Sequence, residues 1–158
     1  MLAVISVLMS LQAPIDSTHC VAAARFLRDT QHMVTITETD TIDDWRTHQR
    51  LAGCRVTAAG GSDVGVPREA TRLYERLRAA QWTRTPDPKD SPNEGSLRFR
   101  WQRSDCLFNV NAQALLNTDA EMRVNDRVHV AAGATRYQVF VMCTPALPAK
   151  ESATLSAR

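Results

Sequence analysis

Four cysteines distributed along the chain constrain the fold more than any other feature of the sequence. They are Cys20, Cys54, Cys106 and Cys143. No two of them have the close spacing of a zinc-binding or dithiol redox motif. An even set of this kind predicts two disulfides that join distant segments, but four thiols allow three connectivities, and the spacing alone does not choose among them.

Predicted strands favour one connectivity. Cys106 begins one predicted strand and Cys143 ends another, so antiparallel pairing of these strands would bring both sulfurs to the same end. We therefore favour Cys106 with Cys143, and Cys20 with Cys54 as the tie between an N-terminal helix and the domain. Each bridge closes a loop of roughly 35 residues, for which chain entropy gives on the order of 3–4 kcal/mol. The alternative is four reduced, buried cysteines in a cytosolic protein.

The first thirteen residues, MLAVISVLMSLQA, have the apolar length of the hydrophobic region of a secretory signal peptide. Residues 1–17 are therefore predicted to be a signal peptide or apolar leader. No Lys or Arg precedes the run, and Pro14 would hinder cleavage directly after Ala13. The other interpretation is an apolar helix or strand that packs on the domain. We expect export to a bacterial periplasm or to the medium, with a cytoplasmic location as the alternative.

A proline-initiated amphipathic pattern predicts the main helix over residues 67–81. Pro67 suits the first turn of a helix. Apolar residues then recur at helical spacing: Ala70, Leu73, Tyr74, Leu77 and Ala80. The opposite face carries the basic residues Arg68, Arg72 and Arg76, which is typical of a solvated helix surface.

Strict alternation predicts a β-hairpin over residues 96–110. Leu97, Phe99 and Trp101 fall on one face of its first strand, and Arg98 and Arg100 fall on the other. A turn over residues 102–105 leads into a returning strand over 106–110. Further strands are predicted at 33–38, 54–59 and 137–143, and the last is apolar on both faces, as a central strand would be.

Three other segments carry weaker patterns. A short helix is predicted over 19–31, with Val21, Ala24 and Leu27 spaced for one face. One or two helical turns are predicted over 40–51, with Thr41 as the cap. Residues 111–135 fit either a helix that starts with a capping box at Thr118 and Glu121 or a two-stranded hairpin over 121–130, and we favour the hairpin.

Together these elements predict an α+β domain over residues 18–148, followed by a disordered tail over 149–158. Its antiparallel sheet has about four to five strands, and the main helix packs on the face of Leu97, Phe99 and Trp101, beside a shorter N-terminal helix. A chain of 158 residues that is 44% hydrophobic supports one such domain. No apolar run reaches the roughly 18 residues of a membrane-spanning helix, so we expect no stable membrane insertion.

Two groups of residues are candidate sites. The acidic cluster Asp40, Asp43 and Asp44 would complement the start of a helix, and with His48 it could supply the acid and base groups of a small hydrolase. Nothing completes a metal-binding loop around it, so we expect no metal and no cofactor. The second group consists of Arg98 and Arg100, and we call it the basic strand face. Arg55 would lie beside them if its strand shares their register.

The formal net charge of +2 is too small to indicate nucleic acid as the partner of the whole surface. The basic strand face could still bind a small acidic ligand or a protein, or, in an intracellular alternative, nucleic acid through Arg98 and Arg100. Aromatic residues that would stack bases lie on the opposite face, which argues against RNA. The sequence is best interpreted as a small, exported, disulfide-stabilised protein that acts in binding or envelope structure and is not an enzyme.

Overall fold

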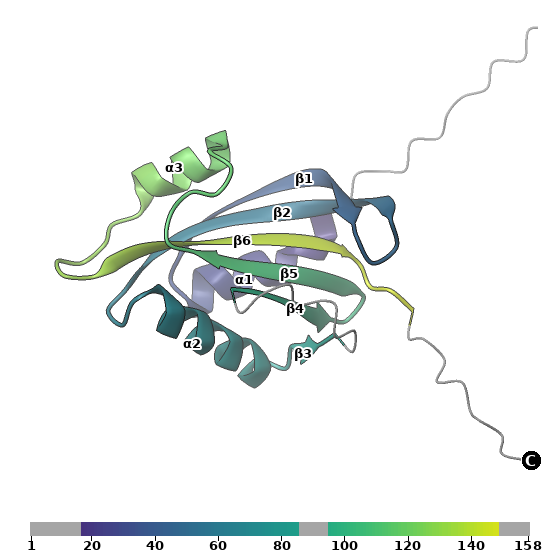
Figure 1. The fold of residues 1–158 in the computed structure, drawn as a ribbon, viewed down its shortest axis with the longest axis horizontal. Coiled ribbons are helices and arrows are strands. Elements are labelled where there is room, and N and C mark those ends of the chain that lie inside the picture. The colour runs from purple at the N-terminus through teal and green to yellow at the C-terminus, as the bar shows by residue number, and fades with distance from the viewer. Residues whose placement is uncertain (1–16, 86–94, 149–158) are drawn as a thin grey trace, which may run out of the picture.

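A six-stranded antiparallel sheet organises the protein (Figure 1). The computed structural model describes residues 17–85 and 95–148, so the predicted leader and tail lie outside it almost entirely. The strands are β1 (Val34–Asp44), β2 (Gln49–Ser62), β3 (Thr83–Arg84), β4 (Ser96–Trp101), β5 (Ser104–Asn111) and β6 (Thr135–Pro145). Their spatial order is β1-β2-β6-β5-β4-β3. The predicted α+β class and antiparallel sheet are confirmed, with one strand more than the four to five expected.

The helices lie on both faces of this sheet. An N-terminal helical segment comprises η1 (Ser17–Cys20), α1 (Val21–Arg25) and η2 (Phe26–Thr30), and it is followed later in the chain by α2 (Val66–Ala79) and α3 (Asp119–Arg127). The N-terminal segment and α2 cover one face, where their apolar side chains join the main core. α3 covers the other face and packs over β1 and β2. We call these two sides the helix face and the α3 face.

The main core follows the predicted alternation of the strands. Phe99 of β4 and Phe108 of β5 are fully buried under α2, and the Phe99 ring stacks on Tyr74 with centroids 5.9 Å apart. β6 lies between β2 and β5, as its two apolar faces predicted. Helix α2 begins and ends within two residues of the predicted 67–81. The prediction was accurate because apolar residues recur at helical spacing along the whole segment.

Val21 departs from the predicted helix face in the N-terminal segment. Ala23, Ala24, Phe26 and Leu27 are buried, whereas Val21 remains 52% exposed. The segment changes from a 3-10 turn through α-helix to a π-helical turn, so a fixed helical period does not describe it.

The predicted helical turns over 40–51 are wrong. This segment forms the end of β1 and the start of β2, which pair in continuous register from Val34 with Ala59 to Asp44 with Gln49. Alternating threonines and Ile42 favour strand, and pairing along the full hairpin satisfies more backbone groups than a single capped turn could. The predicted strands 33–38 and 54–59 are therefore the inner parts of one long hairpin.

The preferred hairpin over 121–130 is also wrong, and the helical alternative holds. α3 starts with a complete capping box, in which the Thr118 side chain accepts from the Glu121 backbone N–H and Glu121 accepts from the Thr118 N–H. Glu121 also accepts from the backbone N–H groups of Leu115 and Leu116. Although burial alone raises the pKa of Glu121, these hydrogen bonds outweigh it and hold the pKa below its usual value.

Candidate functional site

All four cysteines form disulfides in the centre of the main core. Cys20 is bonded to Cys54 and Cys106 to Cys143, with Cα–Cα distances of 5.9 and 4.1 Å. These are the pairings that the sequence favoured. Cys54, Cys143 and Cys106 occupy one row across β2, β6 and β5, so the two bridges lie next to each other, and every cysteine is 0% exposed. No cysteine is left as a thiol nucleophile or metal ligand.

The arginines of the predicted basic strand face lie on the α3 face, opposite the aromatic residues of β4, as their alternation indicated. Each has a partner within the fold. Arg98 is only 3% exposed, and its guanidinium lies over the Trp45 ring, 4.8 Å from the centroid. Arg55 Nε lies 3.1 Å from Asp40, and Arg100 Nε donates to Asp105 at 2.7 Å. Ligand binding by this face therefore stays a prediction, for three arginines that each already make a contact within the fold.

Arg46 completes a buried ionic network that sequence analysis did not identify. Its guanidinium donates to Asp44 Oδ2 at 2.7 Å and to Asp105 Oδ2 at 2.9 Å, and Arg100 contacts the same Asp105 carboxylate. The side chains of Asp44, Arg46 and Asp105 are at most 3% exposed. The turn between β1 and β2 places Arg46 against Asp105 of β5. No local sequence pattern predicts a contact between residues so far apart in the chain.

Desolvation and hydrogen bonding oppose each other at the two carboxylates of this network. Burial alone raises the pKa of Asp105, but hydrogen bonds from Arg100 and Arg46 outweigh it and hold the pKa below its usual value. The same balance, with Arg46 as the donor, lowers the pKa of Asp44. Both carboxylates are therefore ionised at neutral pH and bound to arginine, which is the arrangement of a structural ion-pair network.

The acidic cluster is only partly brought together. Asp43, Asp44 and His48 border a hollow of about 310 Å³ with Trp45 and the start of β2, whereas Asp40 lies outside it and pairs with Arg55. The Asp44 carboxylate is occupied by Arg46, and the Asp43 side chain is 86% exposed near Arg50. Across the described residues, no group of three or more His, Cys, Asp or Glu side chains could hold a metal ion.

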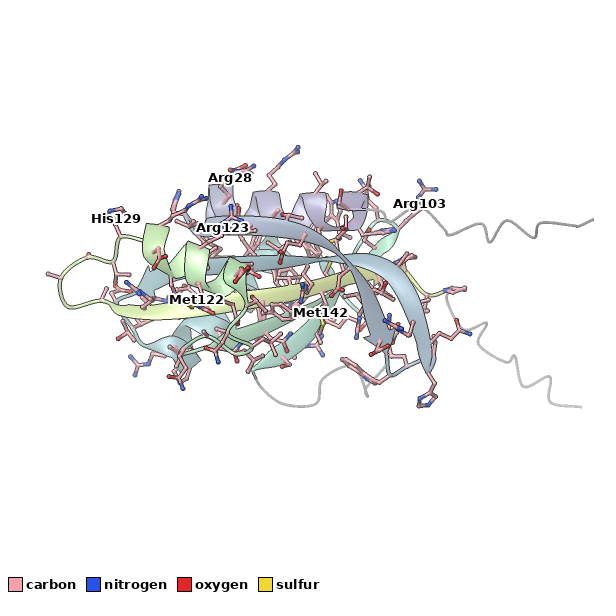
Figure 2. All side chains as sticks on the ribbon, turned by 90° about the horizontal axis from the view of Figure 1, so that it is seen from above. Arg28, Arg103, Met122, Arg123, His129 and Met142 are labelled. Atoms are coloured by element: carbon pink, nitrogen blue, oxygen red, sulfur yellow. A yellow bond between two sulfur atoms is a disulfide. The ribbon has the colours of Figure 1, made fainter. Side chains whose placement is uncertain are left out.

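A larger cavity, of about 440 Å³, lies on the helix face between the N-terminal helical segment and the turn that joins β4 to β5. We call it the helix–turn cavity. One wall comes from the helical segment and the other from the turn; the residues are Thr18, His19, Val21, Ala22, Arg25, Trp101, Gln102, Arg103 and Ser104. A hydrogen bond of 2.7 Å between His19 Nδ1 and Ser104 Oγ joins the two walls. Figure 2 shows Arg103 beside the N-terminal end of the helical segment and Arg28 near the C-terminal end of that segment.

No pattern in the sequence indicates this cavity. Its residues come from segments more than 75 positions apart, and each segment carries an unremarkable pattern of its own. In the structure, Gln102 in the turn between β4 and β5 adopts a positive φ of 52°. Such a conformation is uncommon for residues other than glycine and is a reason to examine a turn.

Comparison of the chain with protein-family models, with curated proteins and with solved structures found no match. None of the helices in the described part of the chain is long and apolar enough to span a membrane.

Proposed function

We propose that this protein is exported and acts as a disulfide-stabilised binding protein rather than as an enzyme. The observation that carries the proposal is the complete use of the cysteines. Both bridges lie in the centre of the core, and together they join the N-terminal helical segment to β2 and β5 to β6. Bridges in such positions have to form during folding, and an oxidising compartment outside the cytosol supports that.

The disposition of the polar groups supports a binding role. Asp44, Arg46 and Asp105 are committed to one another inside the protein, so they are not available to a reacting substrate. The His19 ring contacts Ser104 through Nδ1, and this contact joins the two walls of the helix–turn cavity. A cavity with walls fixed in this way is suited to holding a ligand.

Secretion and thiol chemistry test the proposal together. The full chain, with a C-terminal tag, is expressed in a bacterial host and fractionated, and each fraction is denatured and alkylated with and without prior reduction. We expect the protein outside the cytoplasm, without alkylation unless it is reduced, and with four adducts after reduction. The matched control lacks residues 1–17 and should remain in the cytoplasm. A full-length chain in the cytoplasm that carries four alkylated cysteines without reduction would contradict the proposal.

A further inference from the structure

We infer that the helix–turn cavity binds a small organic anion, with a carboxylate or phosphate group attached to an apolar body. The inference rests on the proposed binding function and names its site and its class of ligand. Three properties of the cavity carry it: the charge of its walls, the apolar side chains that line it, and the covalent fixation of both walls.

Among the described residues, the formal charge that lines the cavity is of one sign. Arg25 lines the cavity from the helical segment and Arg103 from the turn, and none of the described lining residues is Asp or Glu. Within the described part of the chain, neither guanidinium has an ion-pair or hydrogen-bond partner for its side chain, in contrast to Arg46 and Arg100. Two arginines on opposite walls of one cavity favour a carboxylate or phosphate, with which a guanidinium can form paired hydrogen bonds.

Apolar side chains line the same cavity as these arginines. Val21 is 52% exposed and Ala22 is next to it on the same wall, while Trp101 stands on the opposite wall. The Trp101 ring is held by Trp82, whose centroid lies 5.5 Å away, so it forms a firm platform. An exposed valine opposite a supported indole can cover the apolar body of a ligand while the arginines hold its charged group.

The two disulfides fix the two walls. Cys20 follows His19 directly and ties the helical segment to β2, and Cys106 lies two residues after Ser104 and ties β5 to β6. The hydrogen bond between His19 and Ser104 then closes the gap between the walls. A cavity held in this way loses little conformational entropy when a ligand enters, which favours binding by a small molecule that makes few contacts.

Titration with matched pairs of probes tests the inference on the oxidised, purified protein. The probes are hexanoate with its neutral partner hexanamide, and phenyl phosphate with its neutral partner benzyl alcohol; inorganic phosphate measures the charge alone. Binding is followed by calorimetry and by tryptophan fluorescence. We expect saturable binding of at least one organic anion, at least about tenfold weaker binding of its neutral partner, and a lower affinity for inorganic phosphate.

The double variant Arg25→Gln with Arg103→Gln should lower the affinity for the organic anion about tenfold or more. Arg28→Gln is the matched control, because Arg28 belongs to the same helical segment but pairs with Asp29 and does not line the cavity. Equal binding of the neutral probes, unchanged binding by the double variant, or no saturable binding up to about 10 mM would each overturn the inference. These outcomes are separate from failure of the proposed export, which the fractionation and thiol count report independently.

Discussion

Ser104 and Asp105 are neighbours in the chain, yet they belong to two regions that use arginine in opposite ways. Alternation along β5 directs Ser104 to the helix face and the helix–turn cavity, and Asp105 to the α3 face and the buried ionic network. On the α3 face, Arg46 and Arg100 meet carboxylates within 3 Å. At the cavity, the described residues of the walls include Arg25 and Arg103 but no Asp or Glu. The difference indicates that charge on the α3 face holds the fold together, whereas charge at the cavity remains available to a ligand.

The largest expected effect comes from breaking the buried network at its centre. Asp105→Asn keeps the shape of the side chain but removes the charge that Arg46 and Arg100 share. Because Arg46 is then left buried with less compensation, we expect the free energy of unfolding to fall by about 3–5 kcal/mol, measured by denaturant titration. Asp43→Asn, at a highly exposed carboxylate of the same sheet end, should change it by less than about 0.5 kcal/mol. Equal effects of the two variants would show that the network contributes little.

The second prediction concerns the disulfide that holds the helical wall of the cavity and has no part in the buried ionic network. Replacing Cys20 and Cys54 with alanine frees the helical segment that forms one cavity wall, while Cys106 and Cys143 remain joined. We expect a loss on the order of 3–4 kcal/mol in the free energy of unfolding, from the loop of roughly 35 residues that is no longer closed. We also expect weaker binding of the organic anion under conditions in which the variant is folded.

Replacing Cys106 and Cys143 is the matched comparison for that variant. It removes a bridge between two strands that also pair directly through their backbones. Its stability loss should be similar, because the closed loop is similar in length, but anion binding should be affected less. A larger loss of binding in this second variant would contradict the idea that the helical wall depends on its own disulfide.

How far the sequence predicted these regions depended on whether the signal was local. The main helix, the hairpin at 96–110 and the favoured cysteine pairing rested on periodic or terminal positions that adjacent residues define, and the structure has all three. The segment 40–51 was assigned as helix because capping is a local signal, whereas the register with residues beyond the turn is not visible locally.

In the segment 111–135 the local capping signal was correct, although the sequence favoured a hairpin. The capping box at Thr118 and Glu121 was visible in the sequence. The backbone N–H groups of Leu115 and Leu116 also donate to Glu121 and stabilise the start of the helix. These two hydrogen bonds depend on the folded loop, so the sequence does not show them. The helix–turn cavity and the role of Arg46 could not be predicted, because each joins segments that only the three-dimensional fold brings together.

The third prediction concerns acid. The pKa values of Asp44, Asp105 and Glu121 are all lowered in the folded protein, so their ionised forms stabilise the fold at pH values above the unfolded-state values of about 4. This contribution is lost as the pH falls through the lower, folded-state values. We therefore expect the free energy of unfolding to decrease steadily below about pH 4, measured by denaturant titration at each pH. Asp105→Asn should have a shallower decrease, and an unchanged slope would remove Asp105 from this account.

The smallest effect on stability is predicted at the cavity, where the comparison is sharpest. Arg103→Gln removes a guanidinium that has no acidic partner within the described residues and lies on an exposed turn, so we expect a change within about 0.5 kcal/mol in the free energy of unfolding. Arg46→Gln, by contrast, removes a buried partner of two carboxylates and should cost several times more. If the cavity holds an anion, the order reverses when binding is measured: Arg103→Gln lowers the affinity, and Arg46→Gln leaves it unchanged in the folded fraction. A substantial loss of stability in Arg103→Gln would instead mean that both regions use arginine to hold the fold together.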